Sequence, residues 1–327
     1  MPTWLLGRLQ ELSNEPLQPH FALQGATNWL RSLSILTENE SDIEPQIQNL
    51  YSSIPSRVNC RELDTLVFEN IHFAFQNIAA LNALNNDVEL KQDICNSAII
   101  CWHDSILFSA KAMIASFYDD EISDIHNDLK LLSKTWQETI IDNELIISPF
   151  SLNVPTLVKK DAGNLIKSYR GSNSYTLDYP VKNETMALGG VLSYLKGTLG
   201  YELWKKEVSI KEMVEFKSLG VDNFRTKIAQ KYRDSILSEN CVNFLVQAER
   251  FRGKSNYRDS LFLTYGENNS ELLDQFISDL LSVSKVFLKC AVSYCSRRVE
   301  PGTWDLFVND IEENTCLTED IEVITPL

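Results

Sequence analysis

The chain lacks the common motifs for metal and nucleotide binding. Its seven cysteines include no CxxC pair and its four histidines include no HExxH spacing, so a zinc site would need ligands from distant segments. The glycines of segment 189–200 match neither GxGxxG nor GxxxxGK followed by Ser or Thr, the patterns of dinucleotide and P-loop sites. No pair of carboxylates forms a recognisable acid–base motif. We therefore expect no metal, no other cofactor and no catalytic residue of these kinds.

Long uninterrupted apolar segments are also missing. The first residues have no basic region followed by a long apolar one, so we expect no signal peptide. The most apolar stretch, 98–116, contains His103, Asp104 and Lys111 and is expected to be a core helix rather than a membrane span. An odd number of scattered cysteines predicts buried thiols rather than a disulfide framework. Together these features predict a cytoplasmic protein that does not bind membranes.

Positive charge is scarce overall but concentrated in one part of the chain. The formal net charge is −15. Residues 1–150 contain 8 Lys and Arg and 21 Asp and Glu. Residues 151–298 contain 22 basic and 16 acidic residues, and residues 299–327 contain 8 acidic residues and no Lys or Arg. This acidic, basic, acidic order allows the segments to neutralise one another as readily as it allows binding of an external anion.

Proline is absent from two long intervals, 56–148 and 181–300. Long helices are allowed there, because proline removes a backbone donor and clashes with the preceding turn. Apolar residues recur at helical spacing in Arg61–Leu84, Val88–Phe117 and Ser270–Arg297. These three segments are the most clearly predicted helices of the chain.

Weaker signals predict shorter helices between them. Ser209 is followed three residues later by Glu212, the spacing of a capping box that would start a helix near residue 210. Further helices are predicted at 222–238 and 241–252, with Gly253 ending the second.

The predicted fold is mainly α, a helical bundle with an inserted, partly irregular or short-stranded segment. We expect four regions. They are an acidic helical region at 1–144, the insertion at 145–205, a basic helical region at 206–298 that packs with the N-terminal helices, and an acidic tail at 299–327. Short strands are expected near 174–178. The tail is expected either to dock on a basic face or to be mobile.

The most distinctive stretch is Gln247–Asp259, which packs four cations into nine residues of an acidic chain. Its cationic groups would neutralise phosphate or carboxylate, and its tyrosine would stack or form a hydrogen bond. The candidate residues for binding nucleic acid or a partner are Arg250, Arg252, Lys254, Tyr257 and Arg258.

Three interpretations of the basic residues between 225 and 258 stay open. They could form internal salt bridges with the acidic N-terminal half of the chain. They could instead bind phosphate or RNA, or they could form a protein–protein interface, because Arg and Tyr favour interface cores.

Two segments resemble HEPN domains, a helical family that includes many prokaryotic ribonuclease toxins and defence proteins. Cys101–Ala115, with its Ala-Lys-Ala pattern, is similar to the early core helix of that family. Arg250–Asp259, followed by the helix at Ser270–Arg297, is similar to the Arg- and Tyr-containing segment that precedes a late helix. The resemblance implies a HEPN-like helical core and, by analogy, a setting in bacterial anti-phage defence or a toxin–antitoxin pair. Ribonucleolytic members carry an arginine followed four to six residues later by a histidine, and that spacing is absent here.

The missing motif favours a non-catalytic accessory or scaffold subunit of a multiprotein defence complex, which binds other subunits and possibly RNA or DNA through the basic block. The alternative is a divergent HEPN-type ribonuclease toxin that uses His103 or another isolated histidine with a distant arginine. His103 open to a cleft beside the basic block would favour the enzyme, and His103 enclosed in a core would weaken it. A homo-oligomer joined through the long helices is a third possibility.

Overall fold

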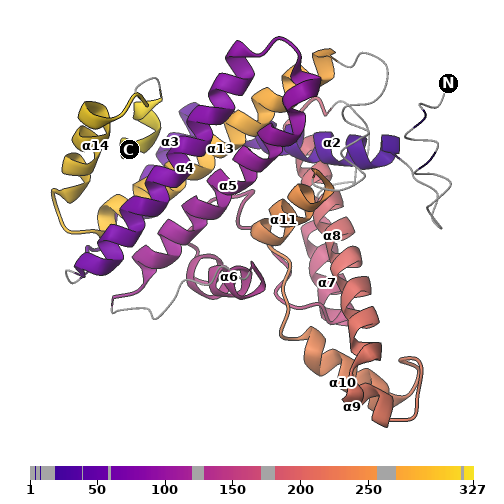
Figure 1. The fold of residues 1–327 in the computed structure, drawn as a ribbon. Helices are drawn as coiled ribbons and strands as arrows, with labels where there is room; N and C mark the ends of the chain where they lie inside the picture. Colours follow the sequence, from indigo (N-terminus) through magenta and orange to yellow (C-terminus); the bar gives the residue numbers. More distant parts are fainter. Residues whose placement is uncertain are drawn as a thin grey trace.

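A computed structural model describes residues 4, 8, 19–38, 40–57, 60–119, 129–170, 181–255, 270–317 and 320–327. The mainly α class is confirmed, since helices account for most of these residues (Figure 1). Within the described ranges the β structure is one isolated antiparallel bridge, between Val154 and Val242. The strand expected near 174–178 lies outside them.

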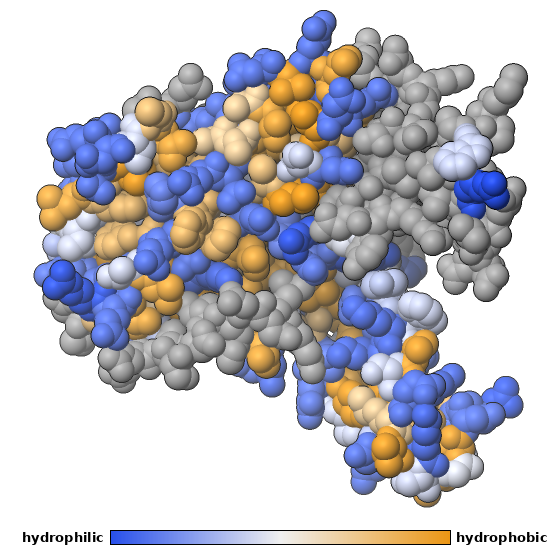
Figure 2. Space-filling view, in the orientation of Figure 1, coloured by the Kyte–Doolittle hydropathy of each residue, from blue (hydrophilic) through white to orange (hydrophobic). Residues whose placement is uncertain are grey.

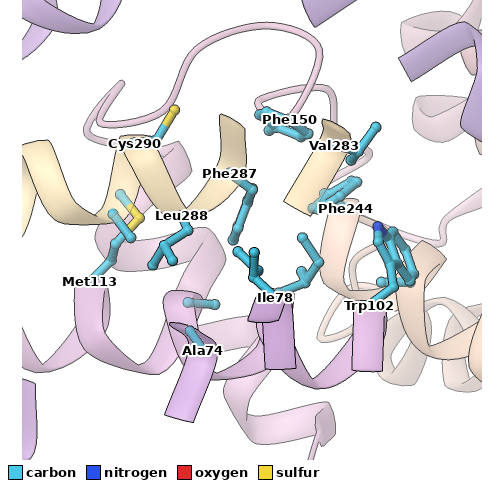
Figure 3. Packing of buried hydrophobic residues seen from close by; sticks show 14 of the residues in the cluster. Ala74, Ile78, Trp102, Met113, Phe150, Phe244, Val283, Phe287, Leu288 and Cys290 are labelled. Carbon is cyan, nitrogen blue, oxygen red and sulfur yellow. The ribbon is translucent and has the colours of Figure 1, made fainter. Parts of the chain in front are cut away.

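Three long helices form the centre of the molecule. Helices α4 (Arg61–Asp87) and α5 (Lys91–Phe117) make an antiparallel hairpin, and α13 (Ser270–Arg298) packs along both. All three predicted long helices are therefore present, close to their predicted bounds. The core between them is drawn in Figure 3 and contains side chains from each helix, including Ala74, Trp102 and Phe287.

The turn of the hairpin is held by one buried lysine at the start of α5. The Lys91 ammonium donates hydrogen bonds to the backbone carbonyls of Leu84 (3.2 Å) and Val88 (2.7 Å), and also to that of Asn85. These carbonyls belong to the last turn of α4 and the residue after it, where they have no partner within the helix. A charged side chain is thus buried only because it caps the preceding helix.

Two buried arginines close the opposite end of the hairpin. Arg57 donates to the carbonyls of Ala115 (2.8 Å) and Tyr118 (3.3 Å) at the end of α5, and forms an ion pair with Asp64 of α4. Arg298, at the end of α13, binds Asp119 at 2.6 Å. Arg298 also donates to the carbonyls of Pro55, Ser116 and Phe117. The end of α5 is therefore stabilised by cations from two distant segments.

Helices α2 (Pro19–Thr37) and α8 (Glu184–Glu212) cross beside this core, with α2 also packed on α13. A Cβ atom on Gly190 would lie 2.3 Å from the hydroxyl oxygen of Ser32, so a larger residue there would force Ser32 to move and would disturb its hydrogen bond to the carbonyl of Asn28. Four further elements lie around the bundle. They are α3 (Glu40–Tyr51), α6 (Leu129–Trp136), the π-helical turn η1 (Gln137–Ile141) that follows α6, and α11 (Phe244–Ser255).

A second, smaller core lies in a protruding lobe (Figure 1). The lobe, defined here as residues 155–170 and 196–238, contains α7 (Lys159–Arg170), the distal part of α8, α9 (Val214–Ser218) and α10 (Lys227–Leu237). Leu157, Ile210 and Phe216 are buried in its core. The lobe projects away from the central bundle, and the long helix α8 connects the two.

The segment 145–205, which was expected to be partly irregular, also contributes helices to this lobe. That segment is irregular only up to residue 158 in its described part, and it then contains α7 and most of α8. The capping-box prediction at Ser209 was wrong, because α8 runs through that residue and ends at Glu212. Gly253 lies inside α11 and does not end it.

The acidic C-terminal segment is docked on the bundle. Helix α14 (Thr303–Asn314) and the 3-10 turn η3 (Ile321–Ile324) pack together, and the Trp304 indole donates a hydrogen bond to the carbonyl of Ile324 at 3.0 Å. The ammonium of Lys285, on α13, binds the carboxylate of Asp320 at 2.6 Å. Of the two expectations for this tail, docking is the one observed.

Helix α5 is long and apolar enough to cross a membrane by length and composition, and it is the one such helix in the described ranges. However, 67% of its most apolar window is buried inside the fold. Core helices of soluble proteins pass the same test, so this is weak evidence for a membrane span.

Candidate partner-binding surface

The predicted basic block begins in α11 and continues past its end. Arg250 and Arg252 lie in the last turns of α11 and are both half-buried. Lys254 lies in the same helix, but the position of its side chain is not among the features described. Tyr257 and Arg258 lie outside the described residues.

Arg250 does not extend toward solvent but lies across α8. Its Nη1 donates a hydrogen bond to the hydroxyl of Thr198 at 2.9 Å. The guanidinium carbon is 5.6 Å from the ring centroid of Tyr194 and 5.0 Å from that of Tyr201, both within cation–π range. Nη1 also lies 3.6 Å from the position that a Cβ on Gly197 would occupy. Arg250 thus joins α11 to α8, a structural role that the sequence did not predict.

Arg252 is placed differently. Its side chain is 35% exposed, and Nη1 lies 3.7 Å from the Glu249 carboxylate one turn earlier. Such exposed ion pairs contribute little to stability. Arg252 is therefore partly open to solvent and lies beside Glu249.

His103 is enclosed where α5 meets α11. Its side chain is 3% exposed, with Nδ1 2.9 Å from the Asp104 carboxylate and Nε2 2.9 Å from the Glu249 carboxylate. Burial acts to lower the pKa of His103, but the hydrogen bonds to these two carboxylates outweigh it and raise the pKa above its usual value. The hydrogen bond from His103 lowers the pKa of Glu249 despite partial burial. In this arrangement the imidazolium donates through both nitrogens and holds α11 against α5.

This pair predicts a pH-dependent contribution to stability. The raised pKa of His103 means that its contribution is complete below the unfolded value of 6.5 and is lost as pH rises through the folded pKa. The lowered pKa of Glu249 means that its contribution is present above 4.5 and is lost as pH falls. Urea titration measures the difference in free energy of unfolding between wild type and His103→Gln. We expect this difference to be largest between pH 4.5 and pH 6.5 and to shrink at higher pH. A difference that stays constant from acidic to alkaline pH would contradict this assignment.

The earlier part of the basic block lies in the lobe. Arg233 is 13% exposed and binds Glu207 at 3.4 Å and Asp234 at 2.8 Å. Its guanidinium carbon also lies 5.4 Å from the ring centroid of Phe224. The ion pairs described for Arg233, and that between Arg252 and Glu249, are therefore with acids of the same region of the chain. Arg225 and Lys231 are exposed.

Sequence reasoning missed an apolar and cationic stripe on the outer face of α8. Tyr201, Trp204 and Val208 are 41%, 59% and 47% exposed, and the Tyr201 and Trp204 ring centroids lie 6.0 Å apart. Their spacing of three and then four residues places them on one face of the helix, and Lys205 and Lys211, both exposed, flank that face. We call these five residues the α8 stripe. Arg250 covers the ring of Tyr201 at one end, and at the other the Lys211 ammonium lies 5.7 Å from the Phe224 ring centroid.

The lobe as a whole is positive in a strongly acidic protein. It contains 13 Lys and Arg against 7 Asp and Glu, whereas the whole chain has a net charge of −15. In Figure 2 it projects at the lower right with hydrophobic and hydrophilic side chains interspersed. An open hollow of about 600 Å³, lined by residues that include Lys217 and Arg225, lies between α9 and α10. The lobe therefore separates positive charge from the acidic body.

In the part of the chain that the structure describes, no group of three or more His, Cys, Asp or Glu side chains is arranged to hold a metal ion. No family model, curated protein or solved structure matches the chain. The resemblance to HEPN domains therefore stays a prediction.

Proposed function

We propose that the protein is a non-catalytic accessory or scaffold subunit that holds an acidic partner on its positive lobe, with the α8 stripe as the contact surface. The observation that carries this proposal is the exposure of Tyr201, Trp204 and Val208 on one helical face between exposed lysines. A large exposed indole next to a second aromatic ring is uncommon on a surface without a binding role. Aromatic and cationic groups are also the types that contribute most to interface energy.

Charge separation supports the same proposal. A positive lobe on an acidic body attracts anionic surfaces to the lobe and repels them elsewhere, so it both speeds and orients association. The aromatic and aliphatic groups of the stripe would then provide the apolar centre of the contact, and Lys205 and Lys211 its charged rim.

Nucleic acid is the second candidate partner. Aromatic rings next to cations occur along the stripe and at Phe224, which lies near both Lys211 and Arg233. Single-stranded nucleic acids bind to such combinations through base stacking and phosphate neutralisation. Their binding weakens steeply with salt, because it depends on neutralisation of the phosphates.

A ribonuclease is less well supported. His103 is 3% exposed and both of its ring nitrogens lie at hydrogen-bonding distance from carboxylates. A general acid–base group needs a ring nitrogen that can reach the substrate. Carboxylates around it would also repel a phosphate. The setting in a bacterial defence complex is proposed from the HEPN resemblance alone, and the cytoplasmic location from the scattered cysteines.

The experiment is capture of the tagged protein from its host, with protein and nucleic acid recovered together. Lys205→Glu/Lys211→Glu should lower partner recovery by roughly tenfold or more, which corresponds to about 1.4 kcal/mol. Lys160→Glu/Lys167→Glu is the matched control, because both lysines are exposed on α7 and the net charge changes equally. Equal recovery with both double variants would contradict the proposed surface. A captured nucleic acid that is lost at high salt would support the second candidate.

A further inference from the structure

The α8 stripe has a complementary surface at the far end of the same chain. Residues 299–327 contain eight acids and no Lys or Arg. On α14, Leu306 is 69% exposed, while the apolar residues Trp304 and Ile311 face the core. Asp310 and Glu313, one and two turns after Leu306, are exposed on the same side of the helix. The outer face of α14 therefore presents one exposed apolar side chain with acidic side chains beside it.

The two surfaces match in kind and in length. The α8 stripe presents Trp204 and Val208 with two lysines at its rim, and the α14 face presents Leu306 with an anionic rim. The exposed acid at the end of α8, Glu212, is paired with Lys217 at 2.7 Å. At about 1.5 Å per residue, α14 is about 18 Å long and the stripe from Tyr201 to Lys211 about 15 Å long. One helix could thus lie along the other over most of its length.

These surfaces lie at opposite ends of the molecule (Figure 1). The lobe extends from the bundle on one side, and α14 covers the bundle on the other. A single copy therefore cannot bring its own α14 onto its own α8 stripe. The complementary pair can be satisfied only between molecules.

We propose that α14 of a second copy docks on the α8 stripe, so that the chains associate head to tail. This inference rests on the proposed function, because it names a partner for the same surface. Leu306 of one copy packs against Trp204 and Val208 of the next, and its acidic rim meets Lys205 and Lys211. The contact is heterologous, so an open assembly of any size keeps one free stripe at one end and one free α14 face at the other, and it can extend. An interface made by two helix faces is small, and the association is correspondingly weak and sensitive to salt.

Two features favour this occupant over nucleic acid. The Arg250 guanidinium lies over the Tyr201 ring and so competes with a base for stacking there. Val208, in the middle of the stripe, has no ring on which a base could stack, whereas it fits against a leucine. The stripe therefore resembles the face of a packed helix more than a stacking platform.

The test is sedimentation velocity of the purified protein over a range of micromolar concentrations at low and high salt. We expect the average mass of the wild type to rise with concentration at low salt and to fall when salt is added. Lys205→Glu/Lys211→Glu and Asp310→Lys/Glu313→Lys should each be monomeric. The first retains a normal α14 face and the second a normal stripe, so an equimolar mixture should form a mixed complex, through this native contact and through the charge-exchanged contact between the other two faces. A variant with all four changes should associate again, because the charges are exchanged.

Circular dichroism and thermal unfolding of every variant should match the wild type, since all four side chains are exposed. A wild type that is monomeric at all concentrations would overturn the inference, as would a mixture of the two double variants that fails to form the complex. A monomeric wild type that binds a single-stranded oligonucleotide through Lys205 and Lys211 would overturn it in favour of nucleic acid. If the wild type is monomeric but host capture of another protein still depends on these lysines, the inference fails and the proposed function stands.

Discussion

Replacing Arg57 by methionine is expected to lower the free energy of unfolding by about 3–5 kcal/mol, because the change leaves a buried carboxylate without its cation. The Arg57 side chain is fully buried and that of Asp64 is 8% exposed. The same guanidinium also provides hydrogen bonds to the carbonyls of Ala115 and Tyr118, which would lose their partner. Urea denaturation followed by circular dichroism measures the loss.

A double variant separates the cost of an unpaired charge from the cost of lost packing. Arg57→Met/Asp64→Leu removes both charges, so it should be more stable than Arg57→Met alone. The recovery should be incomplete, since Asp64 also accepts a hydrogen bond from the backbone N–H of Glu300 at 3.1 Å. A loss of less than 1 kcal/mol in the single variant would show that water reaches Asp64 and that this end of the bundle is open.

Arg250 and Arg252 are expected to respond very differently to alanine substitution, although two positions apart. Arg250→Ala should cost about 2 kcal/mol, because it removes the hydrogen bond to Thr198 and the cation–π contacts with Tyr194 and Tyr201. Arg252→Ala should cost clearly less, since its ion pair with Glu249 is 3.7 Å long and about a third of its side chain is exposed. Thermal and urea unfolding of the two variants provide the comparison.

Equal losses of stability in these two variants would contradict the role of Arg250 in joining α11 to α8. A large loss at Arg252 alone would mean that the surface arginine holds the fold and that the α8–α11 junction does not depend on Arg250. Arg252 is also the better residue for charge reversal in a binding assay, because its removal leaves the α8–α11 junction intact.

The long helices could be predicted because local and tertiary signals agree in them. Proline-free segments with a continuous apolar stripe predicted Ser270–Arg297, and the structure has α13 at Ser270–Arg298. The hairpin of α4 and α5 follows the same logic, since burial of one stripe requires a neighbouring helix.

Helix α8 was missed for a physical reason. Its first part falls in the segment predicted to be partly irregular, yet Gly190 lies inside the helix, where α2 crosses at close range. Its first half is buried against the bundle and its second half is mostly exposed, so no single apolar stripe runs along it. The apolar residues at 201, 204 and 208 have helical spacing in the sequence. They were not recognised as one helical face, because the predicted insertion ended at residue 205, between the second and the third of them.

The basic block could be located from sequence, but its orientation could not. Positions 250 and 252 differ by roughly 200° around a helix, so they face nearly opposite directions. Whether Arg250 met solvent or another helix depended on where α8 lies, and that placement is set by packing between segments 50 residues apart. Charge clustering therefore indicates a candidate site without showing which of its side chains are available.

The central claim, that partners bind on the α8 stripe, can be tested most directly through Trp204. Four of the other five tryptophans are buried, and Trp4 is the second exposed one. In a Trp4→Phe background, Trp204 is therefore the indole most accessible to acrylamide, a neutral quencher that the charge of the lobe does not attract. The account predicts that this quenching is strong in the free protein and is lost when the captured partner is added. A partner that binds while Trp204 remains equally quenchable would place the contact elsewhere and contradict the account.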